Sequence, residues 1–344
     1  MPGMTAIFAR YRSLIGTALR DSIPDSTVTS DLFGMLRYHL GWVDRNMQSV
    51  QHRGGKHLRP VLCLLCCEAV GGSAHAALPA AVALELLHNF SLIHDDIEDR
   101  GSERHGRPTI WALWGEPLAV NAGDAMLILS ELALLRGPEY GVSPSLTVTM
   151  LRLLNECCLR LTQGQHLDLT LEGKPEVTRD QYFQIITGKT AALLGCSAEL
   201  GALSGGAPPE LAQHYREFGR SLGLAFQIQD DVLGIWGIPE NTGKAAAADV
   251  YGHKVTLPVI DALERAPSTI AARIAAVYRN PSPSAEDVAE VIGYLTETGA
   301  RERAEAIAAD YVTTAMAALT AASPRPDLAA DLRTFAQALV GRTS

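Results

Sequence analysis

The sequence predicts an all-α protein, and three of its features support that fold class. Alanine and leucine dominate most segments, aromatic residues make up only 6% of the chain, and apolar residues rarely alternate with polar ones at the period of a β-strand. Hydrophobic residues account for 47% of the 344 residues and charged residues for 19%, which allows a large buried core. We expect one domain over residues 1–344, because no low-complexity linker and no repeat divides the chain.

Glycine and proline mark the ends of the expected helices, for example at Gly71, in the stretch 100–109 and at Pro324. The expected architecture is a bundle of long helices. Its helices are predicted over approximately residues 5–20, 29–50, 57–70, 76–98, 116–136, 145–171, 179–203, 209–236, 255–264, 268–279, 284–297, 299–322 and 326–341.

Charge and composition argue against several classes of protein. Acidic residues outnumber basic ones by 38 to 29, whereas a nucleic-acid-binding protein usually presents a basic face. No run of 18 or more apolar residues predicts a membrane span, and Arg10 and Arg12 interrupt the short apolar N-terminal stretch where a signal peptide would need continuity. Cys63 and Cys66 form a CxxC inside an apolar helical segment, which we interpret as buried apolar residues in a reducing cytoplasm.

A first acidic motif ends an apolar helix in the segment LIHDDIEDR, which contains Asp95, Asp96 and Asp99. Residues four apart share one helix face, so Asp95 and Asp99 could hold Mg²⁺ together with substrate phosphates. The alternative is a solvated helix end. Acidic residues at a helix C-terminus oppose the helix dipole, which favours a bound cation.

A second acidic motif, FQIQDDVLGIWG, ends another apolar helix with Asp230 and Asp231. Two such endings in one chain are harder to explain as solvated termini. Opposed across a cavity, they would form a two-sided carboxylate site for several Mg²⁺ ions, which neutralise the charge that develops on a diphosphate leaving group.

Basic residues lie in four further segments. Lys56 and Arg59 lie in GGKHLRP, which could bind phosphate or could be an ordinary basic helix start. Arg104 and His105 lie in a loop directly after the first acidic motif, where they would pair with it or bind an anion beside it. Lys189 precedes Thr190 in an apolar helix, a pattern also typical of a lysine that extends its charge to solvent. The segment TGKAAAADVYGHK contains Lys244 and Lys254.

In this order the segments resemble the trans-prenyl diphosphate synthase family, which includes farnesyl and geranylgeranyl diphosphate synthases. The resemblance extends from about Gly54 to Pro258 and rests on GGKxxRP, HxxxLIHDDxxD, RxGRPT, GKTA, FQxxDD, TGK and KxTLP. It implies an all-α helical bundle of the isoprenoid-synthase type around a central cavity, commonly dimeric. It also implies a transferase that condenses isopentenyl diphosphate with an allylic diphosphate in three stages: Mg²⁺-assisted ionisation, attack by the double bond, and proton loss.

The resemblance also implies roles for individual residues. Asp95 and Asp99, supported by Asp96, and Asp230, supported by Asp231, would hold about three Mg²⁺ ions. The residues implied to contact isopentenyl diphosphate are Lys56, Arg59 and His88. Those implied to contact the allylic diphosphate are Arg104, Lys189, Lys244 and Lys254, while Thr190 and Gln227 would face the developing cation.

Two residues depart from the family pattern. Gly234 stands at the fifth position of the second motif, where the usual DDxxD has an aspartate, so we expect weaker metal binding there. His105 replaces an arginine that normally meets isopentenyl diphosphate, and a neutral imidazole is a weaker ligand for an anion.

Phe90, five positions before Asp95, could close the floor of the product cavity, while Ser91 leaves room beside it. This pattern resembles geranylgeranyl (C20) more than farnesyl (C15) diphosphate synthases; the alternative is that Phe90 is an ordinary core residue. Two other functions remain open, a terpene cyclase on the same fold and a non-catalytic subunit of a heteromeric synthase. The isopentenyl-site residues argue against the first and the intact first motif argues against the second.

Overall fold

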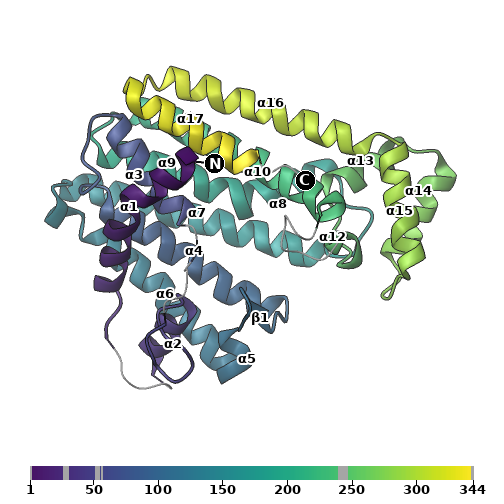
Figure 1. Cartoon of the computed structure of the whole chain (residues 1–344), viewed down its shortest axis with the longest axis horizontal. Helices are drawn as coiled ribbons and strands as arrows, with labels where there is room; N and C mark the ends of the chain where they lie inside the picture. Colours follow the sequence, from purple (N-terminus) through teal and green to yellow (C-terminus); the bar gives the residue numbers. More distant parts are fainter. Residues whose placement is uncertain (1, 26–30, 51–54, 56, 239–246, 342–344) are drawn as a thin grey trace. The chain divides into compact units, whose positions relative to one another are not determined.

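The computed structural model describes residues 2–25, 31–50, 55, 57–238 and 247–341, and it confirms the all-α prediction (Figure 1). The chain forms two compact units. The first contains Met1–Asn155, Ser197–Gln213 and Pro324–Leu332. The second contains Glu156–Cys196, His214–Ser323 and Arg333–Ser344. The expectation of a single domain over residues 1–344 stays a prediction.

The first unit is built around helix α4 (Leu78–Glu98), which packs against α1, α3 and α6. Its sequence is apolar all round, as expected for a helix enclosed by others, and almost every residue from Leu78 to Ile93 is buried. The contact with α6 is close, because a Cβ atom at Gly123 would overlap the imidazole of His94 near the end of α4. The other elements of this part are α1 (Pro2–Asp21), α2 (Leu32–His39), α3 (Leu58–Ala69), β1 (Glu103–Arg104), β2 (Arg107–Pro108), α5 (Ile110–Trp114), α6 (Glu116–Leu135) and η1 (Gly137–Tyr140).

Four described helices have residues in both units: α7 (Pro144–Leu171), α9 (Ala192–Ser204), α10 (Pro209–Trp236) and α17 (Pro326–Val340). The remaining elements are α8 (Arg179–Ile186), η2 (Thr187–Ala191), α12 (Ala248–Tyr251), α13 (Leu257–Arg265), α14 (Ser268–Tyr278), α15 (Ala285–Glu297) and α16 (Ala300–Ala321).

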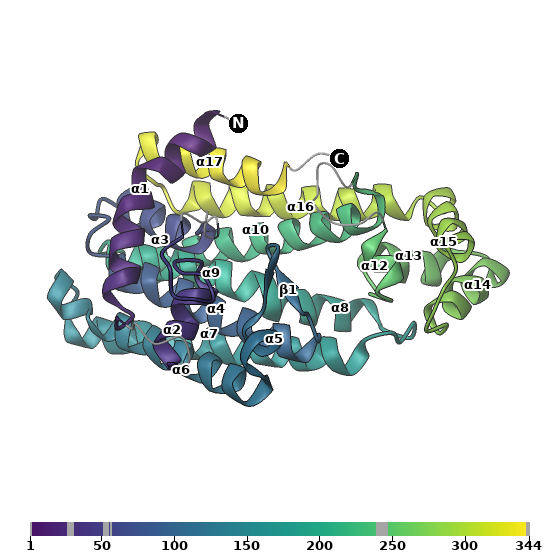
Figure 2. The ribbon, with the colours of Figure 1, turned by 60° about the horizontal axis from the view of Figure 1, so that its bottom comes forward.

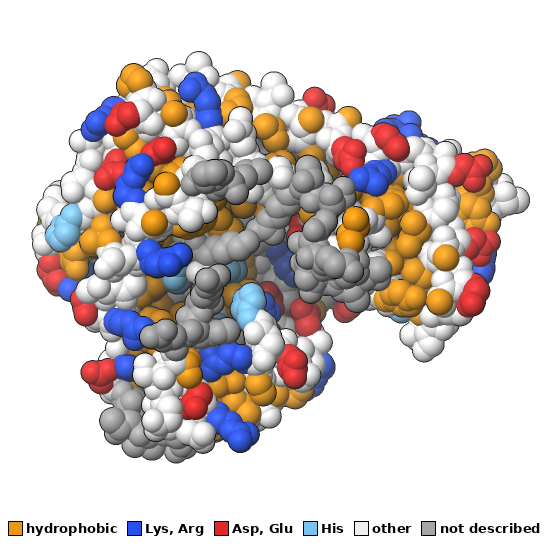
Figure 3. Space-filling view, viewed as in Figure 1, with side chains coloured by type: hydrophobic (Ala, Val, Ile, Leu, Met, Phe, Trp, Pro, Cys, Tyr) orange, Lys and Arg blue, Asp and Glu red, His pale blue; other side chains and the backbone are white. Residues whose placement is uncertain are grey.

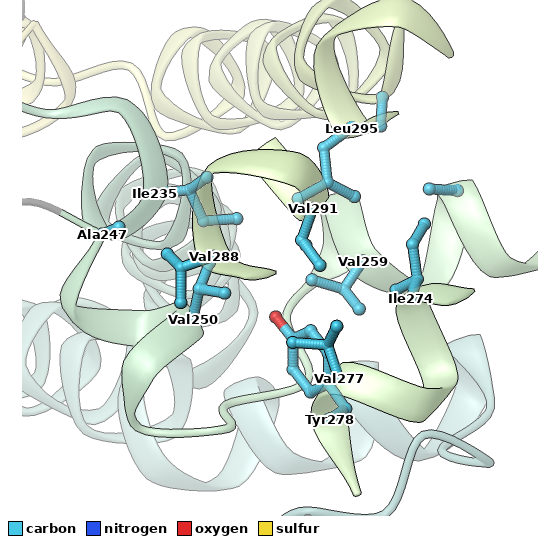
Figure 4. Close-up of a cluster of buried hydrophobic side chains, with 12 residues drawn as sticks. Ile235, Ala247, Val250, Val259, Ile274, Val277, Tyr278, Val288, Val291 and Leu295 are labelled. Carbon is cyan, nitrogen blue, oxygen red and sulfur yellow. The ribbon is translucent and has the colours of Figure 1, made fainter. Parts of the chain in front are cut away.

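An apolar cluster in the second unit joins the end of α10 to four short helices (Figure 4). Ile235 of α10 and Val250 of α12 pack in it together with Val259 of α13 and buried side chains of α14 and α15. Figure 2 shows α14 and α15 side by side. Because burial of apolar side chains is the main stabilising force in folding, this cluster holds α12 against the end of α10.

The helix expected over residues 29–50 is wrong in its second half. Helix α2 ends at His39, and Gly41 follows with a φ of 76°, which terminates the helix. Val43 then pairs with Ser49 in an isolated antiparallel bridge. The expected helix over 179–203 is also interrupted, because residues 187–191 form a π-helical turn between α8 and α9. The short elements β1, β2, α5 and α12 were not expected.

Helix α6 is the one described helix that is long and apolar enough to cross a membrane by length and composition, with 39% of its apolar window buried. The same properties are found in core helices of soluble proteins, so this is weak evidence for a membrane span. On the face shown in Figure 3, acidic and basic side chains of the described residues are interspersed and do not form one basic surface.

Candidate functional site

The first acidic motif forms the last turn of α4. Asp99 caps the helix, and its backbone N–H donates to the carbonyl of Asp95 over 2.8 Å. Asp96 is buried and accepts hydrogen bonds from the guanidinium of Arg104, with Nε and Nη2 each 2.8 Å from its Oδ1. Burial raises the pKa of Asp96, and Arg104 opposes this rise. The pairing leaves Asp95 and Asp99 on the more accessible side of the motif.

A tight hairpin returns Arg104 to the acidic end of α4. Its two central residues, His105 and Gly106, both have positive φ values, 54° and 72°, as a two-residue β-hairpin of the primed type requires. Arg107 fixes the other strand, since its Nη2 donates to the carbonyl of Val43 over 2.7 Å. His105 therefore occupies the tip of the hairpin, beside the arginine that binds Asp96.

Basic groups gather near His88 in the first unit. Burial lowers the pKa of His88 well below its ordinary value, and the charges of Arg59 and Arg104 and the nearby His39 lower it further. Burial and Arg104 likewise lower the pKa of His39 to about 3. Both imidazoles are thus neutral at pH 7, and Arg59 and Arg104 supply the positive charge. The structure therefore brings together three of the predicted anion ligands, Arg59, His88 and Arg104; Lys56 lies outside the described residues.

His57, two residues before Arg59, has a different partner. His57 Nδ1 lies 2.8 Å from Glu85 Oε1 on α4, and this pairing raises the His57 pKa although burial alone would lower it. The backbone of His57 is left-handed, with a φ of 46°, at the start of α3. The ion pair connects the basic segment to α4 one helical turn before Asn89.

In the second unit, Asp231 has no solvent exposure and accepts three hydrogen bonds. Tyr182 donates to Oδ2 over 2.7 Å, while Gln227 Nε2 and Lys254 Nζ donate to Oδ1 over 3.0 and 2.8 Å. A buried carboxylate costs free energy unless it is paired and hydrogen-bonded, and these donors meet that need. Burial would lower the pKa of Lys254, but Asp231 and Asp249 raise it overall, so Lys254 is charged.

The network extends from Asp231 to the predicted cation-facing residues. Gln227 accepts a hydrogen bond from Thr190 Oγ1 over 2.7 Å. Lys189, the neighbour of Thr190, pairs with Asp168 of α7, with Nζ 2.5 Å from Oδ2. The second unit therefore links Thr190, Gln227, Asp231 and Lys254 by hydrogen bonds, and Lys189 adjoins Thr190 in the chain. Asp230 is half-buried on the same helix, and Lys244 lies outside the described residues.

The π-helical turn η2 carries Lys189 and Thr190, and two glycines make room for it. A Cβ atom at Gly188 would lie 2.6 Å from the carbonyl oxygen of Arg160 and 2.8 Å from the Cα of Gly164. A Cβ at Gly164 would lie 2.8 Å from the backbone nitrogen of Lys189. Helix α7 thus crosses η2 backbone to backbone, and a π-turn is a common feature of functional sites. This crossing sets where Lys189 and Thr190 project.

Sequence reasoning missed Asp168, Tyr182 and His39. Asp168 lies between two leucines in α7, and a carboxylate within an apolar helical stretch is a signal that was present in the sequence. Nothing in the sequence around Tyr182 or His39 indicates a role in the site. Their importance is visible only from the residues that lie beside them in the folded protein.

The donor set suits Mg²⁺ held partly by substrate. Among the described residues, no group of three or more His, Cys, Asp or Glu side chains converges to hold a metal ion by itself. Mg²⁺ is typically bound by one or two carboxylates together with substrate phosphates and water, and Asp95 and Asp99 offer such a pair. Paired aspartates that hold Mg²⁺ beside cationic side chains could neutralise the charge of a diphosphate.

The comparisons agree with this class. A family model described as polyprenyl synthetase matches residues 41–295. A farnesyl diphosphate synthase of Mycobacterium tuberculosis is 40% identical over 315 residues, which cover 90% of this chain and 85% of the relative. A geranylgeranyl diphosphate synthase of the same organism is 39% identical over 326 residues, covering 94% and 91%. The crystal structure of a polyprenyl synthetase from Streptomyces coelicolor superposes with a TM-score of 0.89 at 32% identity, covering 98% and 99%.

The chain belongs to the polyprenyl synthetase family. It is a prenyl diphosphate synthase, a transferase of prenyl groups, and the predicted resemblance is confirmed. The family is generally Mg²⁺-dependent.

Replacement of Gly188 tests the crossing of α7 and η2. Gly188→Ala should lower the free energy of unfolding by about 1–3 kcal/mol, because the new methyl group meets backbone atoms that must move apart. The rate of product formation should also fall, because Lys189 and Thr190 directly follow Gly188 in η2 and would be displaced with it. The matched control is Gly293→Ala in α15, where a Cβ meets nothing within 4 Å and the change should stabilise the helix by up to about 1 kcal/mol. Equal melting temperatures for the two variants would contradict the account.

Proposed function

We propose that the protein condenses isopentenyl diphosphate with an allylic diphosphate to give a longer all-trans prenyl diphosphate. The observation that carries this proposal is the proximity of Arg59 and His88 in the first unit, in addition to the acidic end of α4, where Arg104 pairs with Asp96. An enzyme that only ionises one diphosphate needs the acidic motif. A second, separate anion site is needed when a second diphosphate takes part.

In the proposed reaction, aspartates of both acidic motifs are the metal ligands. Asp95 and Asp99 would hold Mg²⁺ with Asp96 as support, and Asp230 would do so with Asp231 as support. About three ions per site is the number implied by the resemblance. When bound, the metal neutralises charge on the departing diphosphate.

The basic side chains bind the two substrates. Lys56, Arg59, His88 and His105 are assigned to isopentenyl diphosphate, and Arg104, Lys189, Lys244 and Lys254 to the allylic diphosphate. Ionisation breaks the C–O bond of the allylic substrate. The isopentenyl double bond then forms the new C–C bond, and a proton leaves to the released diphosphate.

Thr190 and Gln227 favour the allylic cation through their oxygen atoms. The Thr190 hydroxyl donates its proton to Gln227 Oε1, so lone pairs of the hydroxyl oxygen remain to face positive charge. Gln227 is held in turn by its bond to Asp231. Dipoles fixed before the reaction need no reorganisation as charge develops, which is why they lower the barrier.

Product analysis by mass spectrometry tests the function. With Mg²⁺ and isopentenyl diphosphate, each of the C5, C10 and C15 allylic diphosphates should be extended, while an allylic diphosphate alone should persist. Cyclised hydrocarbon from the allylic substrate alone would indicate a terpene cyclase. Absence of turnover would indicate a non-catalytic subunit of a heteromeric synthase, and either result would reject the proposal.

The product is proposed to be geranylgeranyl diphosphate. Phe90 would close the floor of the cavity that holds the growing prenyl chain. Phe90 is only 9% exposed, and its ring lies edge-on against His94, with centroids 4.9 Å apart. It precedes Asp95 on the same helix by five residues, a little over one turn. The similar mycobacterial enzymes are named for farnesyl and geranylgeranyl products.

Phe90→Ala should shift the product distribution toward longer chains, because removal of the ring opens space below the growing chain. Leu84→Ala is the matched control, since Leu84 is fully buried in α4 but projects from a different side of the helix. Both changes should destabilise the protein by about 2–5 kcal/mol, and only the first should lengthen the product. Identical product profiles for wild type and Phe90→Ala would show that Phe90 is an ordinary core residue.

A homodimer is proposed to form through α6. This helix leaves large apolar side chains exposed, among them Ile128 and Leu132 at 53% each, and an apolar face of this kind marks an interaction surface. We expect light scattering to give twice the mass of the chain. Leu132→Glu should yield monomer, while Thr313→Glu on the exposed side of α16 should not. A monomeric wild type would reject the dimer.

A further inference from the structure

Gly234 marks the place of a missing carboxylate on α10. It lies four residues after Asp230, hence on the same helix face, at the position where the family pattern has the last aspartate of DDxxD. Gly234 is buried, and the space beside it is filled. A Cβ atom built at Gly234 would overlap the carboxylate of Asp249, lying 2.9 Å even from the more distant oxygen, Oδ1. A carboxylate from α12 therefore occupies the volume where a side chain at 234 would begin.

The core of the second unit fixes this contact. The sequence neighbour of Gly234, Ile235, and that of Asp249, Val250, pack in the same apolar cluster (Figure 4). Ala247 begins the turn into α12 with a left-handed backbone, φ 55°, and Asp249 follows in the first turn of that helix. The approach of Asp249 to α10 is thus set by buried packing.

Charge supports the same arrangement. Lys254 Nζ lies 4.0 Å from Asp249 Oδ2 and 2.8 Å from Asp231 Oδ1, so one ammonium group lies between two carboxylates. The Lys254 backbone N–H also donates to the Asp249 carbonyl over 2.9 Å, closing the turn after α12. The side chain of Asp249 is 13% exposed, compared with 0% for Asp231. Of these two carboxylates, only that of Asp249 is partly exposed.

We propose that Asp249 replaces the carboxylate missing at position 234, so that the second acidic motif is completed by α12 instead of by α10. The inference rests on the proposed function, because it assigns Asp249 to the Mg²⁺–diphosphate site that includes Asp230. It also agrees with a glycine at 234, because a side chain there would displace the Asp249 carboxylate from its present position. The competing explanation is that Asp249 only neutralises Lys254.

The test measures Mg²⁺ binding without turnover. The full chain is titrated with Mg²⁺ at a fixed concentration of inorganic diphosphate, and the midpoint of the rise in melting temperature is recorded. Asp249→Asn should raise the midpoint about tenfold. Asp310→Asn, which changes an exposed acidic residue of α16, is the matched control and should leave the midpoint unchanged.

A pair of compensating changes separates the two explanations. Gly234→Asp alone should lower the melting temperature, because two carboxylates compete for one volume. Gly234→Asp combined with Asp249→Gly should restore the midpoint to within about threefold of wild type, whereas Asp249→Gly alone should not. If the single changes at 249 prevent folding, recovery of folding and of the midpoint in the double variant supports the proposal equally.

Each remaining result has one meaning. An unchanged midpoint in Asp249→Asn, or a double variant as weak as Asp249→Gly, overturns the proposal and leaves Asp249 as a partner of Lys254. A wild-type protein that Mg²⁺ and diphosphate do not stabilise would instead count against the proposed function itself.

Discussion

The buried carboxylate of Asp231 imposes the strictest constraint on the second unit. A carboxylate with no solvent exposure must be matched by donors, and here they come from Tyr182 on α8, Gln227 on α10 itself and Lys254 after α12. Through Gln227 the same constraint reaches Thr190. Removal of one partner from such a network costs more than its hydrogen bond contributes, because a buried charge is left behind. The negative charge of Asp231 therefore positions Gln227 and, through it, Thr190, the two side chains proposed to face the allylic cation.

In each acidic motif, two adjacent aspartates have different surroundings, and the same difference is found in both units. In both, the second aspartate of the pair is buried against a cation, Asp96 against Arg104 and Asp231 against Lys254. The first aspartate, Asp95 or Asp230, is more accessible. This division explains how a pair of adjacent carboxylates can combine rigidity with metal binding. The buried member holds the basic residues in place, and its neighbour is available to a ligand.

Much of the protein could be predicted from its sequence, because ordered motifs such as HDDIED and QDD carry their chemistry in local spacing. The long helices followed from composition and glycine–proline punctuation. The error at residues 29–50 arose where a single glycine, Gly41, ended a helix whose apolar pattern continued. The π-turn at 187–191, the Tyr182–Asp231 bond and the contact of Asp249 with Gly234 could not be predicted, because they depend on which helices cross. Those crossings are fixed by packing between residues that are far apart in the sequence, so no short segment of the sequence predicts them.

The most direct test of this account is a double-mutant cycle of Tyr182→Phe and Asp231→Asn, followed by the free energy of unfolding in denaturant. Both side chains are buried and the hydrogen bond between them is 2.7 Å long, so the cycle isolates one contact of the network. If Asp231 organises the second unit, the coupling energy should reach about 1.5–3 kcal/mol, as for hydrogen bonds to charged groups. Additivity to within about 0.5 kcal/mol would show that the two residues act independently and would contradict the account.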